Sequence, residues 1–508
     1  MKRTFIRVLS LVLCLIMMVA IFAACDDKGK GGIQTTTTTP PQGTTPPTGG
    51  TTSVEIDPEW GVIPEDVDYG GETYQLLLWA NAKGQLFPEA MVEGEDIRND
   101  LYLRNQAIEE YLGMKFDTTF MQSHGSGAGG DELYNHALEG RIPYVGICAY
   151  SIYPPKLALE GLLADMNSLE YPYTEMAWYP KQIAAWEIKD RLFFLANNSS
   201  VRNILANWCI YANNVMIESK GLEEIADVVL DGRWTLDTLR TYSRNWDSEA
   251  QGNASKVEAD RVYGFTIVHC TAIQAFYHAA GFQAARRNAE GEPEFAFFGK
   301  TDIEQTSAFV DKFLDICKDS NFGYGDQGMY NGNWTAPLAN ENAAFYAGAL
   351  DMYTRIDEDG TWTIIPLPKL TEEQTEYYTI QNYAFDVWCI PEYAKDIEVG
   401  GLIIEATSYN DYAEIARTFY DYDFKYRYSA DDRGVQIFDL IRTSFYADFA
   451  RAWSIGGPYQ VLKNCLSTGV DRVTLTNTYA TSVGGLRTSC QTALRNLNKL
   501  IDELFPEG

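Results

Sequence analysis

Apolar and polar positions along the first part of the ordered chain predict strands that alternate with helices. Short, nearly continuous apolar runs at 74–80 and 144–149 are typical of buried strands, and 115–121 predicts another strand between them. Residues 96–112 place apolar side chains on one helical stripe, and 131–138 predicts a second, short helix. The order strand–helix–strand–helix–strand predicts a parallel sheet with right-handed crossovers.

The middle of the chain continues this pattern, and the part after about residue 396 is mostly helical. Thr235 is expected to cap a helix, because its hydroxyl can accept a hydrogen bond from a nearby backbone N–H group. The remaining expected elements are a hairpin at 188–195 that turns at Lys189-Asp190-Arg191, strands at 204–212, 262–268, 362–365 and 384–390, and helices at 157–163, 272–280, 303–317, 397–406, 412–422, 435–449 and 486–504.

The first 54 residues have a different pattern. Basic residues precede an apolar run at 8–24 that ends in small residues, which predicts an export signal over 1–24 and not a membrane span. Residues 25–54 are rich in Thr, Pro and Gly and contain almost no apolar side chains. Such a segment forms no core, and its prolines favour an extended, semi-rigid stalk.

Phe22-Ala23-Ala24-Cys25 resembles the bacterial lipobox, with Phe where Leu is usual. The resemblance implies cleavage before Cys25 and attachment of a diacylglyceryl group to its sulfur. A thiolate is nucleophilic enough near neutral pH to accept the lipid, and two or three acyl chains hold a soluble domain on a bilayer. We therefore expect an exported protein on the outer face of the cytoplasmic membrane, touching the bilayer through Cys25 only.

Composition limits the possible functions. About 450 residues follow the signal and stalk, which is more than one core usually holds, so two lobes are expected. The formal net charge of -30 repels phosphate backbones and excludes nucleic acid as a partner. Seven cysteines follow Cys25 without a CxxC motif, and Cys148, Cys209 and Cys389 lie in apolar runs, where a thiol behaves as a small buried hydrophobe.

From about Gly71 to its end, the chain resembles the extracellular solute-binding proteins of ABC importers, in the large sugar-type group. The order of several motifs carries the resemblance more than any one of them does. These motifs are Asp96-Ile97-Arg98-Asn99-Asp100 with Arg104-Asn105, Gly161-Leu162-Leu163-Ala164-Asp165-Met166-Asn167, Gly232-Arg233-Trp234-Thr235, Ile365-Pro366-Leu367-Pro368-Lys369, and 417–442.

The resemblance implies an α/β, periplasmic-binding-protein-like fold of type II, with two lobes joined by a hinge of several chain crossings. Lobe 1 is expected to hold 71–200 plus 365–428, and lobe 2 to hold 201–364 plus 429–508. A small-molecule ligand caught between the lobes stabilises the closed form, which the membrane permease subunits recognise. We expect a monomer that performs no reaction and uses no cofactor or metal.

Candidate ligand-binding residues lie at strand ends, at the expected hinge and at positions that the resemblance nominates. Aromatic rings can stack on the C–H faces of pyranose sugars, while polar side chains hydrogen-bond the hydroxyls, so a mono- or oligosaccharide is the expected ligand. The candidates are Trp79, Asn81, Tyr150, Ser151, Arg202, His269, Tyr353, Tyr383 and Trp453.

Other functions stay open at this point. The acidic surface and aromatic cleft would also suit a basic peptide, and a surface glycan-binding protein outside any transporter fits the same features. A glycan-hydrolysing enzyme stays possible because 70 acidic residues can supply paired carboxylates, although HExxH and GxSxG motifs are absent from the sequence. Gly125, Gly127 and Gly130 match GxGxxG, but Asp131 would repel a pyrophosphate at the helix start, so we expect a cleft-rim loop there.

Overall fold

The computed structural model divides the chain into Met1–Glu55 and Ile56–Gly508, and all described residues belong to the second unit. The described residues are 63–64, 67–79, 86–121, 136, 139, 142–197, 200–246, 261–267, 270–288, 293–296, 300–324, 335–382, 385–455, 488, 491–492, 494–499 and 502–503. The predicted signal and stalk, Cys25, the GxGxxG loop and most of the expected helix at 131–138 lie outside them.

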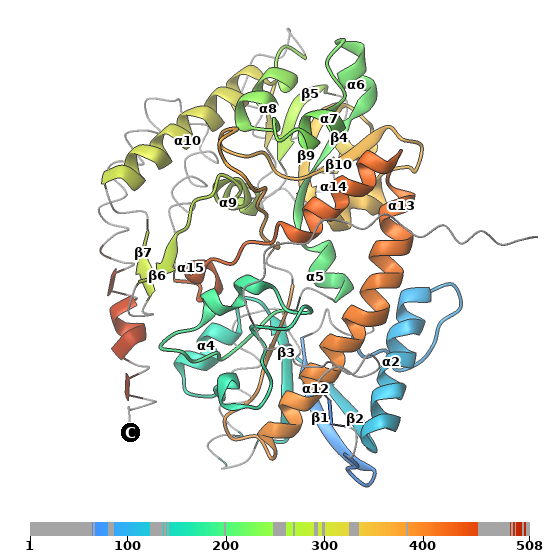
Figure 1. The fold of residues 1–508 in the computed structure, drawn as a ribbon, viewed down its shortest axis with the longest axis vertical. Coiled ribbons are helices and arrows are strands. Elements are labelled where there is room, and N and C mark those ends of the chain that lie inside the picture. Colours follow the sequence, from blue (N-terminus) through green and yellow to red (C-terminus); the bar gives the residue numbers. More distant parts are fainter. Residues whose placement is uncertain are drawn as a thin grey trace, which may run out of the picture. The chain divides into compact units, whose positions relative to one another are not determined.

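The first sheet has the strand order β11-β3-β1-β2, and Figure 1 labels its strands β1, β2 and β3. β1 (Glu72–Leu78) lies between β2 (Met114–Phe120) and β3 (Tyr144–Tyr150) and pairs with both in parallel, which confirms the predicted parallel sheet. β11 (Asp386–Cys389) adds an antiparallel edge to β3, with Asp386 opposite Tyr150. The strand was predicted, but not its partner.

Two long helices pack together beside this sheet. α2 (Asp96–Leu112) has the predicted bounds and ends at Gly113, whose φ of 60° is the left-handed conformation that favours glycine. α12 (Ile397–Asn410) packs against β3 and α2. A Cβ atom at Gly400 would overlap the carbonyl oxygen of Val145, so a glycine here allows the helix to lie close to the strand.

The helix after α12 has an unusual hydrogen-bonding pattern. η6 (Asp411–Ile415) and η7 (Arg417–Phe424) are π-helical, and α13 (Lys425–Arg427) returns to α-helical geometry. The predicted helix at 412–422 is therefore confirmed as a helix, with wider turns than expected. π-Helical turns are rare in proteins, and those that occur are often located at functional sites.

The second sheet has the order β10-β4-β9-β5-β8. β4 pairs antiparallel with β10 and β9, and β5 pairs in parallel with β9 and β8. Its strands are β4 (Trp208–Asn213), β5 (Tyr263–Ile267), β8 (Gly323–Tyr324), β9 (Ala343–Ala349) and β10 (Trp362–Ile365). A separate two-stranded sheet pairs β6 (Ala285–Arg287) with β7 (Pro293–Phe295).

One predicted strand is wrong over its first residues. The expected strand at 204–212 begins instead as helix α5 (Val201–Leu205), and β4 starts only at Trp208. The Ser200 hydroxyl caps α5 by accepting a hydrogen bond from the Asn203 N–H at 3.1 Å. This local cap overrides the β preference of the apolar residues that follow.

Helices surround the second sheet. The Thr235 cap is confirmed, because its hydroxyl accepts from the Thr238 N–H at 3.3 Å at the start of α8 (Leu236–Ser243). The expected helix at 435–449 is too long: α14 (Asp432–Thr443) stops where Phe445 forms a β-bridge with Thr379. The other helices are α6 (Asn214–Ser219), α7 (Ile225–Leu230), α8 (Leu236–Ser243), α9 (Cys270–Ala279), α10 (Lys300–Asp319), α11 (Ala336–Ala339), η5 (Leu350–Arg355) and α15 (Phe449–Ala452).

The predicted turn at 189–191 is also present. Ile188 and Arg191 exchange two backbone hydrogen bonds of 3.0 Å, and Lys189 and Asp190 have φ values of 51° and 58°. Positive φ at both central residues is the requirement of a type I′ hairpin turn. Nearby short helices are α4 (Pro154–Leu159), η2 (Met166–Ser168) and η3 (Lys181–Trp186).

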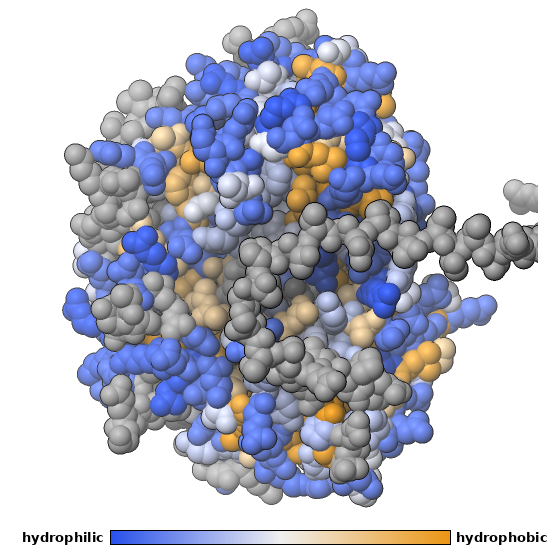
Figure 2. All heavy atoms as spheres, in the orientation of Figure 1, coloured by the Kyte–Doolittle hydropathy of each residue, from blue (hydrophilic) through white to orange (hydrophobic). Residues whose placement is uncertain are grey.

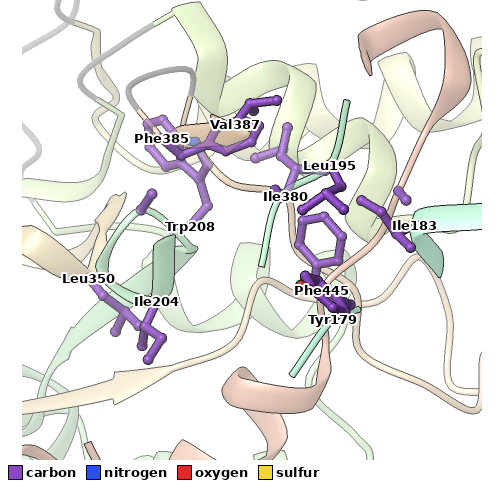
Figure 3. Close-up of a cluster of buried hydrophobic side chains, with 14 of the residues drawn as sticks. Tyr179, Ile183, Leu195, Ile204, Trp208, Leu350, Ile380, Phe385, Val387 and Phe445 are labelled. Carbon is purple, nitrogen blue, oxygen red and sulfur yellow. The ribbon is translucent and has the colours of Figure 1, made fainter. Parts of the chain in front are cut away.

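The two sheets share a continuous apolar core where the chain passes between them. Figure 3 shows one buried cluster to which Val387 of β11, Ile204 of α5 and Trp208 of β4 all contribute. The strands of the first sheet fall within the ranges expected for lobe 1, and those of the second within the ranges for lobe 2 except for Ile365 at the border. The lobe boundaries themselves stay a prediction. Among the described residues, no helix has the length and apolar character needed to cross a membrane.

Candidate functional site

A cleft of about 800 Å³ lies between helices that flank the two sheets. One wall comes from the N-terminal half of α2 and from residues 415–428 of the following π-helical and α-helical segment. The other wall comes from α5, which precedes β4, and from η5, which follows β9. The volume is within the range that small-molecule sites occupy.

Aromatic rings form part of the cleft wall. Tyr353 of η5 meets Phe424 with ring centroids 4.9 Å apart and Tyr428 with centroids 5.4 Å apart. Phe419 lies 5.5 Å from Phe424, measured between centroids. Tyr353 was nominated from the sequence, whereas Phe419, Phe424 and Tyr428 were missed because they belong to a helix that the sequence does not place beside η5.

Arg202 of α5 connects the cleft with a buried cluster behind it. Its guanidinium carbon lies 4.8 Å from the ring centroid of Trp79, and its Nε lies 3.5 Å from Oδ1 of Asp386. The indole N–H of Trp79 donates to the same Asp386 oxygen at 2.7 Å. Burial raises the pKa of Asp386, and the nearby Arg202 charge opposes that shift.

The structure brings three of the nominated side chains together in this cluster. Trp79 and Tyr150 have ring centroids 5.2 Å apart, and Arg202 covers the Trp79 ring. Trp79 is only 1 % exposed, so its ring is part of the core in this conformation, whereas Tyr150 is half-buried. Stacking of a ligand on Trp79 stays a prediction.

Asn203 holds the chain passages beside the cleft together. Its amide nitrogen donates to the carbonyl of Asn197 at 2.8 Å and to the carbonyl of Asp386 at 3.1 Å, while its oxygen accepts from the Asp386 N–H at 2.8 Å. Gln381 donates in turn to the Asn203 carbonyl at 3.0 Å. Sequence reasoning missed Asn203, although a polar side chain inside an apolar run signals a buried hydrogen-bonding role.

Ser151 and Trp453 lie away from the 800 Å³ cleft. Ser151 is buried and borders a cavity of about 10 Å³ with Trp186 and Arg451. Trp453 is 1 % exposed, donates to the Trp186 carbonyl at 2.9 Å, and has its ring centroid 5.0 Å from that of Phe194. Their predicted ligand contacts stay untested. Asn81, His269 and Tyr383 lie outside the described residues.

Two residues of the helix motif that contributed to the resemblance have structural roles. Arg104 pairs with Asp411 inside the protein, and the Asn105 amide nitrogen donates to the Leu86 carbonyl at 3.1 Å. Both contacts hold α2 against neighbouring segments of the chain. The N-terminal residues of α2 line the cleft. In the described part of the chain, there is no group of three or more His, Cys, Asp or Glu residues that could hold a metal ion.

Comparisons with known proteins support the fold. No family model matches the sequence, and no curated protein sequence matches it. Among solved structures, the galacto-N-biose-/lacto-N-biose I-binding protein of the ABC transporter from Bifidobacterium longum, in complex with lacto-N-biose, has a TM-score of 0.53 and 12 % identity, covering 85 % of this chain and 98 % of its own. UgpB from Mycobacterium tuberculosis, in complex with glycerophosphocholine, has a TM-score of 0.53 and 14 % identity, covering 82 % and 98 %. The expected periplasmic-binding-protein-like α/β fold is confirmed.

Proposed function

We propose that this chain is the substrate-binding subunit of an ABC importer and captures a mono- or oligosaccharide by closing its two lobes around it. The observation that carries the proposal is the 800 Å³ cleft, with one wall from helices beside the first sheet and the other from helices α5 and η5, which are connected to strands of the second sheet. A ligand in such a cleft touches both walls and stabilises the closed arrangement. Permease subunits in the membrane would be the partners that recognise this arrangement.

The chemistry of the cleft supports a saccharide. Tyr353 and Tyr428 offer ring faces and hydroxyl groups, and the charged side chains around them can accept or donate hydrogen bonds to sugar hydroxyls. The B. longum protein of the same fold was solved with lacto-N-biose, a carbohydrate.

The sequence also indicates where in the cell the protein acts. We propose that the signal at 1–24 directs export and that Cys25 carries the lipid that anchors the stalk at 25–54. Metabolic labelling with a radioactive fatty acid tests the anchor. The intact chain should take up label and the Cys25→Ser variant should not; equal labelling of both would refute the anchor and leave the binding function standing.

Ligand binding is tested by a stability screen of the purified chain against mono- and oligosaccharides. A ligand present at 100 times its dissociation constant raises the free energy of unfolding by about 2.7 kcal/mol. Small-angle X-ray scattering should then show a smaller radius of gyration with the ligand, and chromatography should recover the ligand unchanged. A chemically altered sugar would refute the transport proposal in favour of an enzyme.

A steric variant connects binding to the cleft. Thr418 is exposed and lines the cleft, so Thr418→Trp should fill it and weaken binding at least 100-fold. Thr443→Trp is the matched control, because Thr443 is also an exposed threonine on a helix but does not line the cleft. If both variants bind as tightly as the unmodified chain, the ligand site lies elsewhere.

A further inference from the structure

We propose that the ligand of this cleft carries a positive charge, as a protonated amino group does on an amino sugar. The inference rests on the proposed function and specifies the class of ligand. The site is the 800 Å³ cleft itself, and its walls carry both guanidinium groups and carboxylates.

The positive charges of the cleft are already paired with protein carboxylates. Three arginines line it, and each lies close to an acidic side chain. The pairs are Arg98 with Glu95 at 3.5 Å, Arg427 with Asp423 at 2.9 Å, and Arg202 with Asp386 at 3.5 Å. A ligand that brought a carboxylate or phosphate would therefore have to compete with these existing partners.

The negative charges are in excess. Asp96, Asp100 and Asp351 also line the cleft, and within the described structure none of these three carboxylates accepts a hydrogen bond or forms an ion pair. Asp96 stands in the first turn of α2, where the partial positive charge of the helix terminus offsets part of its own charge. Asp100 and Asp351 are therefore the carboxylates that most need a positive partner.

These two carboxyl groups lie in surroundings that disfavour their charge. Protein atoms close to the Asp351 carboxyl raise its pKa to about 6 and the charge of Arg202 opposes that shift, although the residue as a whole is exposed to solvent. The pKa of Asp100 is raised by burial and by the neighbouring charge of Asp96. A cation bound between the walls would supply the compensating charge that the protein does not provide.

The aromatic wall favours the same type of ligand. Tyr353 lies two residues from Asp351 on η5, and it forms a cluster with Phe424 and Tyr428. The faces of aromatic rings attract cations through their quadrupole, and this attraction strengthens where water is excluded. Carboxylates and ring faces thus both favour a cation in a cleft whose own cations are engaged.

Ligand pairs that differ only in charge test the inference. Isothermal titration calorimetry would compare the β-1,4-linked glucosamine disaccharide at pH 6.5, where its amines are largely protonated, with its N-acetylated, neutral twin. A lysine-containing tripeptide and its Nε-acetylated twin form the second pair, because a protonated amine can also come from a peptide. We expect the charged sugar to bind at least tenfold tighter than its twin, with an affinity that falls as salt rises.

Variants of the lining carboxylates test where the positive charge of the ligand binds. Asp351→Asn and Asp100→Asn should each weaken binding of the charged sugar about five- to tenfold and leave binding of the neutral twin within twofold. Glu110→Gln is the matched control, because Glu110 is an exposed carboxylate on α2 that does not line the cleft. Circular dichroism and thermal melting of each variant establish that the chain is folded before binding is measured.

The outcomes separate this inference from the proposed function. If neutral saccharides bind and their charged twins bind no tighter, the charge inference is overturned and the saccharide-binding function stands. If only the charged peptide binds, the charge inference holds and the saccharide proposal is wrong. If no member of either pair and no saccharide in the screen binds, both proposals fail.

Discussion

Arg104 of α2 and Asp411 of η6 form a buried ion pair in which guanidinium Nη1 lies 2.5 Å from carboxylate Oδ1. Their side chains are 2 % and 1 % exposed. Arg104 Nη2 also donates to the Leu86 carbonyl at 2.5 Å. One guanidinium therefore joins α2, the start of the π-helical segment and the chain that follows β1.

The first prediction concerns this pair. Arg104→Met leaves the Asp411 carboxylate buried without its partner, and we expect a loss of about 3–5 kcal/mol in the free energy of unfolding, measured by urea denaturation. The double variant Arg104→Met/Asp411→Leu should recover much of that loss, because it removes both buried charges.

The control for this prediction is an exposed pair. Arg286 and Glu294 lie 3.0 Å apart with side chains 54 % and 46 % exposed, so Arg286→Met should cost less than about 1 kcal/mol. If Arg104→Met costs no more than Arg286→Met, the buried pair does not stabilise the fold as described.

A second prediction compares two buried tryptophans. Trp79 donates its indole N–H to the Asp386 carboxylate at 2.7 Å, and Trp234 donates to the Pro366 carbonyl at 2.9 Å. Replacement of either tryptophan by Phe removes one hydrogen bond, and the loss of side-chain volume is the same in both variants. Because hydrogen bonds to charged groups contribute about 1.5–3 kcal/mol and neutral ones about 0.5–1.5 kcal/mol, Trp79→Phe should be the more destabilising. Chemical denaturation of both variants checks this, and an equal or opposite ranking would contradict it.

The third prediction is a pH dependence at Glu405, which is buried in the middle of α12. Its carboxyl accepts from the Trp178 indole at 3.0 Å and from the Tyr179 hydroxyl at 2.8 Å. Burial raises the pKa of Glu405 from 4.5 to about 7, and these hydrogen bonds oppose the shift. In the folded state the proton is therefore held more tightly than in the unfolded state.

The direction of the effect follows from that difference. The stabilising contribution of the bound proton is complete below pH 4.5 and is lost as the pH rises from there through about 7. Relative to Glu405→Gln, the unmodified chain should lose on the order of 3 kcal/mol of unfolding free energy over this interval. Parallel denaturation series at pH 4.5 and pH 8 measure it, and a pH-independent difference between the two proteins would exclude Glu405 as the titrating group.

A fourth prediction concerns Asp448, whose buried carboxylate accepts three backbone hydrogen bonds. The donors are Ala284 at 2.7 Å, Ala285 at 3.2 Å and Arg451 at 2.9 Å. Asp448→Ala leaves these groups without that acceptor and should cost about 3 kcal/mol or more. Asp431→Ala, at an exposed helix cap on α14, should cost only about 1 kcal/mol. Equal losses in thermal denaturation would show that the link between β6 and α15 is weak.

Local signals account for what the sequence predicted well. The helix at 96–112 follows from its own apolar stripe, and the Thr235 cap and the turn at Lys189 and Asp190 follow from the chemistry of a few neighbouring residues. The parallel pairing of β1, β2 and β3 follows from their alternation with helical segments. The helix, the cap and the turn depend on contacts between close neighbours in the sequence, and the order of strands and helices indicates the parallel pairing.

The features that were missed depend on tertiary contacts. A tryptophan at a strand end reads the same whether it faces a ligand or the core, and only the structure shows Trp79 covered by Arg202 and hydrogen-bonded to Asp386. The aromatic cleft wall could not be assembled either, because Phe424 and Tyr353 are neighbours only after folding. The strand at 204–212 is an exception, because the Ser200 cap that competes with its apolar pattern is a local contact.

The pairing of β11 with β3 has a consequence for how the chain matures. Asp386 meets Tyr150 across more than 200 intervening residues, and those residues include all the described strands of the second sheet. The first sheet therefore lacks this edge until residue 389 of the 508 has been made, and closing so large a loop costs entropy before any contact repays it. The first sheet is therefore completed late in synthesis, after the strands of the second sheet have already been made.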